Sequence, residues 1–447
     1  MGVPFAGKDR FCPPLSGAIL SLIALICSLA FPPALPAADV PTREIEDDSY
    51  LRLSLKNAWF TESPGRILAN KPFIHTMPGG GRIEVRTETA GGEFMVILAR
   101  ERNNTFPGWA QGSWILTRRM DTGEVSRIRI FLRSDPYTYI QFRPLNEERI
   151  QMDAVVYDGY VIRSLPLPVS LDRIMELPVE AVLDLAGSKF PRRYYDPMPE
   201  RYRDLRSFIA KVRERLPELS FRDDGAIDDR GRYVFINTLE VQNGQPGLNC
   251  SGFAKWITDG IRRPFTGDRL AVSPLKEPFG SRTSSYSEAL EAQRDPFFGL
   301  DWTRNLAAAG IAVRSPSFGT LEEIEVQKNP FASVIMRTRQ GSSIRPYPGF
   351  LPNAGFGAEG IHPLLYTLAI DEPGHIYLAS ISNEMGRPRM RQHFHVAALV
   401  PYFNEYGNFQ VAVFESAAET SFTAFKNRYP GHYINLVRIF AEGSFDP

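Results

Sequence analysis

Residues 247–256 read GLNCSGFAKW and contain Cys250, the last of the three cysteines of the chain. Apolar residues follow Cys250 after four, seven and eleven positions, at Ala254, Ile257 and Ile261. This spacing is typical of one buried face of an α-helix and predicts a helix that begins near the cysteine. A helix N-terminus has unpaired N–H groups and a partial positive charge, which stabilise a thiolate and can stabilise an oxyanion. The pattern therefore makes Cys250 a candidate nucleophile.

The other two cysteines lie in an N-terminal segment of different composition. A basic start precedes an apolar run at residues 15–31, and small residues follow this run. This order is typical of a secretory signal, which we predict over residues 1–38, and it indicates an exported protein, either periplasmic or secreted. An uncleaved N-terminal membrane anchor is the alternative. The mature chain would keep Cys250 as its one thiol, which is then reactive, bonded to another chain, or buried and inert.

The overall charge of the chain is balanced. Its 447 residues include 51 Lys and Arg and 51 Asp and Glu, so the net charge is zero. A neutral chain has no global field that attracts nucleic acid, and we expect no nucleic-acid partner. No later segment is apolar enough to span a bilayer, so we expect no stable membrane span after signal cleavage.

The pattern of apolar residues divides the remaining chain into three parts. Residues 45–168 contain short alternating runs separated by turn residues, which predicts an antiparallel all-β domain, a sandwich or small barrel. Apolar residues at three- and four-residue spacing then predict a helical connector at 169–220. A second domain follows at 221–447. Together these parts predict the α+β class.

Within the second domain, residues from about 262 to 360 are rich in Gly, Pro and Ser. Only two pieces of regular structure are expected there: a helix at SYSEALEAQRD (285–295) and a strand at FASVIMRTR (331–339). Irregular segments of this length are usually functional or mobile.

A predicted hairpin supplies partners for a nucleophile. Residues 393–416, HFHVAALVPYFNEYGNFQVAVFES, read as two apolar strands joined by a turn. A hairpin centred on Glu405 places His395 directly opposite Glu415, within contact distance. Both are polar ends of apolar strands, which is costly unless the two groups satisfy each other. A register shifted by one residue would instead place Ser416 opposite the histidine.

These residues predict a catalytic set of Cys250, His395 as base and Glu415 as the acceptor that orients the base. His393 is expected to be a supporting or solvent-exposed residue, and His375 a structural one. A metal bound by the two strand histidines and Glu415 is the alternative, but no ligand cluster with recognisable spacing accompanies them. We expect no metal and no cofactor.

At this point the sequence resembles the NlpC family of papain-like cysteine peptidases, which cut peptides of the bacterial cell wall. LNCSGFAKW is similar to the nucleophile helix of the family, commonly D-C-S-G-F, with Cys250 as nucleophile. HVAALV resembles the H-V-G-[IV]-Y strand that carries the base, here His395. PGHIYLAS resembles the G-D-[ILV]-V-x-F strand, with His375 where Asp is usual. Glu415 stands at the place of the third polar residue.

The sequence departs from the family pattern in three ways. Asn249 replaces the common Asp, and the third residue is Glu where His, Asn, Asp or Gln is usual. The nucleophile and the base are separated by 145 residues (395 − 250), so residues 262–360 would be an insertion. The resemblance covers roughly half of the second domain and none of the first. It implies a papain-like catalytic domain, with the nucleophile helix packed on an antiparallel sheet.

The expected function is that of an exported cysteine hydrolase, a thiol protease or amidase. The resemblance and the signal together imply amide bonds of peptidoglycan stem peptides as the substrate. Two alternatives stay open: a thioester-forming acyltransferase on the same fold, and a catalytically inactive exported binding protein. Protein partners cannot be read from the residues.

Overall fold

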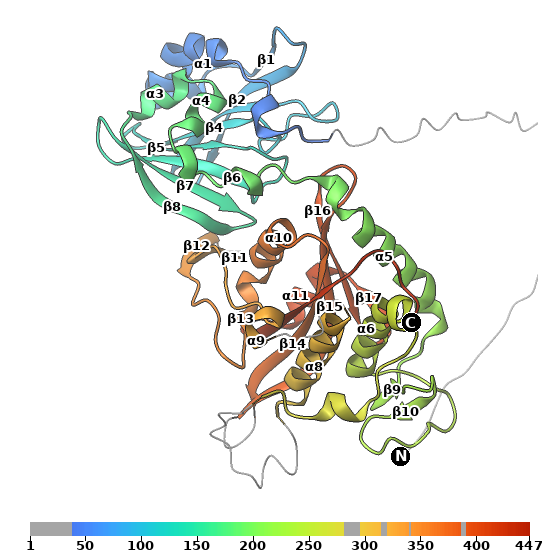
Figure 1. The fold of residues 1–447 in the computed structure, drawn as a ribbon. Helices are drawn as coiled ribbons and strands as arrows, with labels where there is room; N and C mark the ends of the chain where they lie inside the picture. The colour runs from blue at the N-terminus through green and yellow to red at the C-terminus, as the bar shows by residue number, and fades with distance from the viewer. Residues whose placement is uncertain (1–37, 281–295, 314–319, 339–340, 386–389) are drawn as a thin grey trace, which may run out of the picture. The chain divides into compact units, whose positions relative to one another are not determined.

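The computed structural model describes residues 38–280, 296–313, 320–338, 341–385 and 390–447 (Figure 1). The predicted signal, apart from its last residue, and the predicted helix at 285–295 lie outside the described residues.

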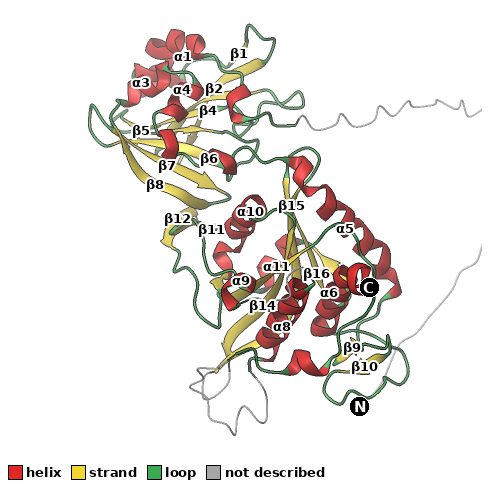
Figure 2. Ribbon diagram, viewed as in Figure 1, coloured by secondary structure: helices red, strands yellow, loops and turns green. Residues whose placement is uncertain are grey.

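The first half of the chain builds a large antiparallel sheet by connecting each strand to the next (Figure 2). Its order is β1-β2-β3-β4-β5-β6-β7-β8-β11-β12. The first eight strands are β1 (Phe73–Thr76), β2 (Arg82–Ala90), β3 (Glu93–Arg100), β4 (Trp114–Arg119), β5 (Val125–Ile130), β6 (Tyr139–Pro144), β7 (Ile150–Val156) and β8 (Gly159–Leu167). The prediction of short antiparallel strands is confirmed. The predicted sandwich or small barrel is not formed, because these strands make one open sheet with β1 and β12 as its edges.

Short helices pack against this sheet. They are α1 (Ser49–Leu55), α2 (Pro64–Leu68), α3 (Leu171–Glu176) and α4 (Val179–Asp184). The guanidinium of Arg52 in α1 donates hydrogen bonds to the carbonyls of Met175 (3.1 Å) and Leu177 (2.6 Å). Ser170 caps α3 by accepting a hydrogen bond from the N–H of Arg173. The start of the predicted connector is therefore tied to the first sheet.

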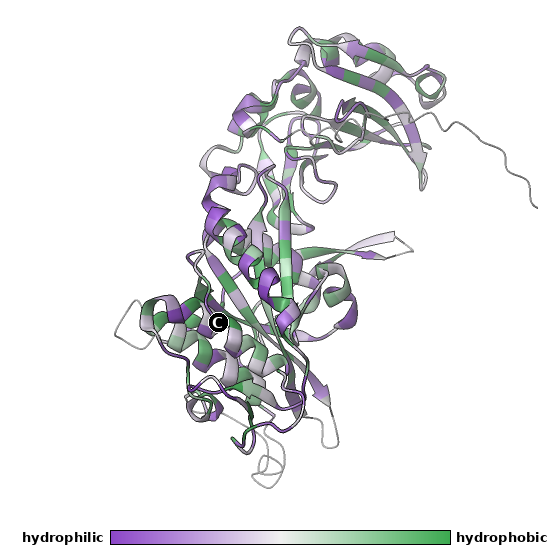
Figure 3. Ribbon diagram, turned by 90° about the vertical axis from the view of Figure 1, so that its right-hand side faces the viewer, coloured by the Kyte–Doolittle hydropathy of each residue, from purple (hydrophilic) through white to green (hydrophobic). Residues whose placement is uncertain are grey.

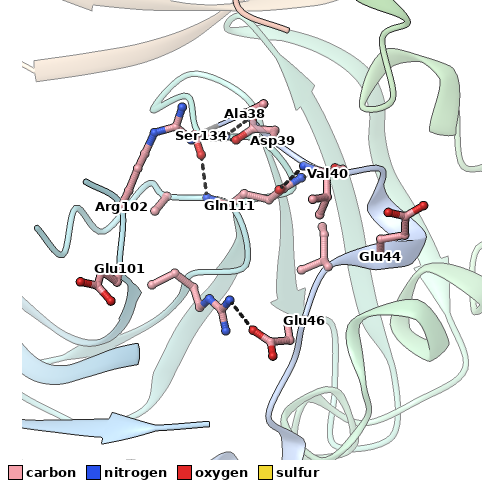
Figure 4. A pocket seen from close by; sticks show the side chains of 12 residues that line it. Ala38, Asp39, Val40, Glu44, Glu46, Glu101, Arg102, Gln111 and Ser134 are labelled. Carbon is pink, nitrogen blue, oxygen red and sulfur yellow. Dashed lines mark hydrogen bonds and ion pairs between the residues drawn. The ribbon is translucent and has the colours of Figure 1, made fainter. Parts of the chain in front are cut away.

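The first described residues are also tied to this sheet (Figure 4). The side-chain amide of Gln111 accepts from the N–H of Val40 (2.9 Å) and donates to its carbonyl (2.7 Å). The carboxylate of Asp39 accepts from Arg102 (2.8 Å) and from the N–H of Ser134 (2.9 Å). These contacts border a cavity of about 360 Å³.

The second half of the chain contains a six-stranded antiparallel sheet with the order β13-β18-β14-β15-β16-β17. Its strands are β13 (Phe356–Gly357), β14 (His375–Met385), β15 (Met390–Phe403), β16 (Phe409–Glu415), β17 (Ala418–Thr420) and β18 (Tyr433–Phe440). A separate small pair is formed by β9 (Gly225–Ile227) and β10 (Tyr233–Phe235). The strands expected within HVAALV, FQVAVF and PGHIYLAS are confirmed.

Helices cover both faces of the six-stranded sheet. Helices α6 (Cys250–Thr266) and α8 (Phe298–Ala312) pack on one face, and α10 (Ile361–Asp371) and α11 (Phe422–Arg428) pack on the other. Two further helices are α5 (Arg203–Arg215) and α9 (Leu321–Ile324). A sheet buried on both faces needs continuous apolar runs, and Figure 3 shows hydrophobic stretches along the strands. The α+β class is confirmed.

The segment predicted as an insertion contributes to both sheets. Its strand β11 (Ser333–Thr338) confirms the strand-like piece and pairs with β12 (Gly341–Pro346). The N–H of Ile335 donates to the carbonyl of Asp158 (2.8 Å), and Arg337 forms an ion pair with the Asp158 carboxylate (2.6 Å). The β11–β12 hairpin thereby extends the first sheet beyond β8. None of the helices in the described ranges combines the length and the apolar character that crossing a bilayer requires.

Candidate functional site

Cys250 is the first residue of α6, as the sequence predicts. The side chain of Asn249 caps the helix by accepting a hydrogen bond from the N–H of Gly252 (2.8 Å). The predicted apolar face is buried at Ala254 and Ile257. The thiol is therefore held at the positive end of a buried helix, and Cys250 itself is only partly buried.

Three glycines allow another segment to lie directly against the start of α6. A Cβ atom on Gly252 would lie 1.9 Å from the carbonyl oxygen of Gly225, and one on Gly225 would lie 2.2 Å from that of Gly247. The N–H of Asn249 donates to the same Gly225 carbonyl (3.0 Å). Only residues without a side chain permit this approach, which fixes the segment at 220–225 beside the cysteine.

A β-bulge on β15 lies next to the proposed base. On β14, Ile381 pairs with His395 while Ser382 pairs with His393, so Phe394 is the extra residue on β15. A bulge bends its strand and changes the direction of the neighbouring side chains. The bulge separates His393 and His395, which a regular strand would place on the same face.

The predicted hairpin register is wrong by two residues. Strands β15 and β16 pair Ala398 with Phe414 and Phe403 with Phe409, so the hairpin is centred on Tyr406 rather than on Glu405. A shift of two residues keeps each side chain on the same face of the sheet. His395 and Glu415 are therefore diagonal rather than direct neighbours, which still leaves long side chains within reach.

The structure brings these two side chains together. His395 Nε2 lies 2.7 Å from Glu415 Oε2, and Glu415 is buried. The other carboxylate oxygen of Glu415 accepts a hydrogen bond from Arg428 in α11. Glu415, rather than Ser416, therefore holds the imidazole, and an arginine holds Glu415.

Cys250 lies on the other side of the same imidazole. Burial raises the pKa of its thiol, but a hydrogen bond to His395 and the charge of that ring lower the pKa. The N–H of Val396 and the hydroxyl of Ser251 lower it further, and the net result is a pKa below the ordinary cysteine value. Because His395 Nε2 contacts Glu415, Nδ1 is the ring nitrogen that remains for another partner. The structure thus places Glu415 in contact with His395, and His395 in the same cleft as Cys250.

The cysteine opens into a cleft of about 350 Å³. Two of the three site residues, Cys250 and His395, line it together with Asn249 and Ser416. The rest of its lining is Phe221, Asp223, Ser251, Phe298, Gly299, His393, Phe394 and Val396. An electrophile that enters this cleft meets the sulfur and the imidazole together.

His393 is neither solvent-exposed nor bonded to the three predicted site residues. It is buried, with Nδ1 2.9 Å from the hydroxyl of Ser380 and Nε2 3.0 Å from the carbonyl of Asn353. Burial lowers its pKa to about 3, so the ring is neutral. A carbonyl only accepts, so Nε2 carries the proton and Nδ1 accepts from the serine. The two hydrogen bonds of this neutral ring hold β15 in place immediately before the bulge.

His375, which the sequence analysis took as structural, and His75 lie in local contacts. His375 Nδ1 is 3.1 Å from the carbonyl of Glu372, and His75 Nε2 is 3.0 Å from the carboxylate of Asp48. Neither lines the cleft.

Sequence reasoning missed two residues that support the site. Trp302 in α8 donates its indole N–H to the carbonyl of Ser251 (2.8 Å), next to the nucleophile. Arg428 bonds to Glu415 from α11. Trp302 lies in the predicted insertion, and Arg428 is one arginine among many, so no local pattern distinguishes either residue.

Replacing His395 with glutamine should make the thiol less acidic. The variant loses the histidine's hydrogen bond and charge, while the burial that raises the Cys250 pKa remains. We expect the pH profile of Cys250 alkylation by iodoacetamide to move to higher pH, with about a tenfold slower reaction at pH 7 for each unit of the shift. His375→Gln is the matched control, and its profile should overlay that of the wild type. An unshifted His395→Gln profile would contradict the assigned contact.

The comparisons with known proteins concern the first half of the chain. A family model described as Domain of unknown function (DUF8515) matches residues 41–194. The matched region runs from before α1 through the first eight strands and α4, and it ends before Cys250. No curated protein and no solved structure matches the chain.

Proposed function

We propose that the protein is an exported cysteine hydrolase that cleaves amide bonds through Cys250, His395 and Glu415. One observation carries the proposal: the 2.7 Å contact that holds His395 between the buried carboxylate and a thiol of lowered pKa. A nucleophile, a base and an acceptor that orients the base are the components of covalent amide hydrolysis. We further propose that residues 221–447 form a papain-like domain. The packing of α6 on the six-stranded sheet and the position of His395 on β15 support this reading.

The proposed reaction begins with the Cys250 thiolate and the protonated His395 imidazole. The sulfur attacks the carbonyl carbon and forms a C–S bond, which moves an electron pair onto the carbonyl oxygen. The C–N bond then breaks, and the imidazolium gives its proton to the leaving amine. Water loses a proton to the neutral imidazole and attacks the thioester carbon. The C–S bond breaks, the acid is released, and the thiolate and imidazolium are restored.

Backbone N–H groups at the start of α6 would stabilise the oxyanion. The first residues of a helix have no intrahelical acceptor for their N–H groups. The side chain of Asn249 accepts a hydrogen bond from the N–H of Gly252. The N–H groups of Cys250 and Ser251 come earlier in the first turn. Donors next to the nucleophile are well placed for the negative charge that develops as the sulfur attacks.

We propose peptides of the bacterial cell wall as the substrate class and the periplasm or the exterior as the location. The similarity of LNCSGFAKW, PGHIYLAS and HVAALV to the NlpC family supports the substrate. The basic, apolar and small-residue order of residues 1–38 supports the location.

The proposed covalent step can be observed directly. The protein without residues 1–38 would be incubated with purified peptidoglycan stem peptides, quenched in acid and analysed by intact mass spectrometry. We expect a mass increase equal to the acyl part of a peptide, localised to the tryptic fragment with Cys250, and a matching released amine. Addition of a nucleophilic amine shows whether the acyl group of the thioester is transferred to water or to the amine. A substrate analogue that hydrolyses slowly would allow the adduct to accumulate. If such an analogue is cleaved and no adduct forms on Cys250, the mechanism is excluded.

A further inference from the structure

Among the described residues that line the cleft, one carries a carboxylate. Asp223 is the one carboxylate of its lining, which has no lysine or arginine. In the proposed mechanism, the Cys250 thiolate and the His395 imidazolium carry opposite charges that cancel. The His393 ring, which also lines the cleft, is neutral because burial lowers its pKa to about 3.

The backbone holds Asp223 beside the nucleophile. On one side of it, the N–H of Arg222 donates to the carbonyl of Leu248 (3.2 Å). On the other side, the carbonyl of Gly225 accepts from the N–H of Asn249 (3.0 Å). Both contacts join the segment at 220–225 to the residues immediately before Cys250, so the backbone that carries Asp223 has a fixed place in the wall of the cleft.

The Asp223 carboxylate is exposed and lacks a cationic partner within the part of the chain that the structure describes. Its Oδ1 accepts the N–H of Asp224 (3.1 Å). The guanidinium of the adjacent Arg222 is directed elsewhere, to the carbonyls of Asn243 (2.6 Å) and Gln245 (2.7 Å). A cleft lined by charge of one sign focuses the electric field, so a charge in its wall attracts ions of opposite sign more strongly than one on an open surface.

Aromatic rings complete this part of the cleft. Phe221 and Phe394 are 63% and 37% exposed, which is unusual for large apolar residues, and Phe298 lines the same cavity. The faces of aromatic rings attract cations, so the rings and the carboxylate favour the same kind of group.

We propose that the cleft selects ligands with a positive charge, an ammonium or guanidinium group, close to the bond under attack, and that Asp223 determines this preference. In its application to substrates, this inference rests on the proposed hydrolase function. The electrostatic preference itself can be measured on the thiol alone.

The test compares two thiol reagents of opposite charge, 2-aminoethyl and 2-sulfonatoethyl methanethiosulfonate. Each rate constant for Cys250 is divided by that of the same reagent with free cysteine at the same pH. We expect wild-type protein to favour the cationic reagent, and Asp223→Asn to reduce the ratio of the two normalised rates by about three- to tenfold. The reduction should shrink as salt is added. Asp229→Asn, which removes a carboxylate from the exposed turn after β9, is the matched control and should leave the ratio unchanged.

An unchanged ratio in Asp223→Asn, or a wild-type preference for the anionic reagent, would overturn the inference. The test does not need turnover, so its outcome is independent of the hydrolase proposal. If stem peptides are cleaved, N-acetylation of the substrate amine nearest the scissile bond should lower kcat/KM for wild-type protein and have a smaller effect on Asp223→Asn. Equal effects in the two proteins would overturn the assignment of Asp223 as a specificity residue.

Discussion

Replacement of Cys250 by alanine should abolish amide hydrolysis, with a loss of at least about 10³-fold in kcat/KM. In the proposed mechanism the sulfur forms the bond to the carbonyl carbon, and neither His395 nor Glu415 would take its place. Cys250→Ser should be similarly inactive, because an alcohol in this position ionises far less readily than the thiol. The measurement is release of new amines from purified cell-wall peptides.

The fold should survive both substitutions. Cys250 is only partly buried, and the capping contact of α6 comes from Asn249 rather than from the cysteine. Thermal unfolding followed by circular dichroism should give midpoints close to that of the wild type. Hydrolysis at the wild-type rate by a well-folded Cys250→Ala protein would remove the proposed function.

Substitution of Gly252 by alanine should cause a large loss of stability for a single added methyl group. The added Cβ would lie 1.9 Å from the carbonyl oxygen of Gly225 and 2.8 Å from the Cα of Ala226, and both atoms belong to the backbone. Neither can rotate away as a side chain would, so the segment and the helix start must separate. Overpacking of this kind costs typically 1–3 kcal/mol and occasionally more, and we expect about 3 kcal/mol.

The matched control is Gly65→Ala in α2. A Cβ atom on Gly65 has no heavy atom within 4 Å, and alanine is favoured over glycine in helices by about 1 kcal/mol. Urea unfolding should therefore show Gly65→Ala to be neutral or slightly stabilised, and Gly252→Ala to be strongly destabilised. Equal free energies of unfolding for the two variants would show that the close approach at Gly225 does not hold in solution.

Local patterns explain why the start of α6 could be predicted from the sequence. The apolar residues at helical spacing after Cys250 predict a buried helix face. In the structure every residue of α6 from Ser251 to Ile261 is buried, and exposed residues follow only beyond Ile261. The position of Cys250 in the first turn then follows from the polar Asn249 before it and the small residues after it. The contact of His395 with Glu415 was also predictable, because both ends of a hairpin are set by one short turn.

The register of that hairpin depends on details of the turn that the pattern does not contain. The side chain of Asn404 accepts hydrogen bonds from the N–H groups of Tyr406 (3.0 Å) and Asn408 (2.9 Å). Gly407 has a φ of 75°, which few other residues adopt readily. These contacts close the turn between residues 404 and 408 and centre the hairpin on Tyr406.

Helix α8 was not predicted because it lacks an amphipathic pattern. Leu300, Trp302 and Leu306 are fully buried, and so are polar neighbours such as Thr303. A helix that is enclosed by protein on several sides loses the contrast between an apolar and a polar face. The sequence around it reads as irregular for that reason.

The neighbour of β11 in the sheet could not be predicted from the sequence, for a different reason. Its pattern predicts a strand, but Val334 pairs with Gly159, a residue far away in the chain. Alternation specifies which face of a strand is buried and leaves its neighbour in the sheet open. The same limit explains why short strands at 45–168 could be expected while their arrangement in one open sheet could not.

The pairing of β8 with β11 has a consequence for dividing the protein into fragments. A truncation near residue 200 would separate a fragment with β8 from a fragment with β11, and each would lose an antiparallel neighbour. Unpaired strand edges recruit other chains. The N-terminal fragment alone should therefore self-associate, whereas one that retains the β11–β12 hairpin through a short engineered linker should stay monomeric.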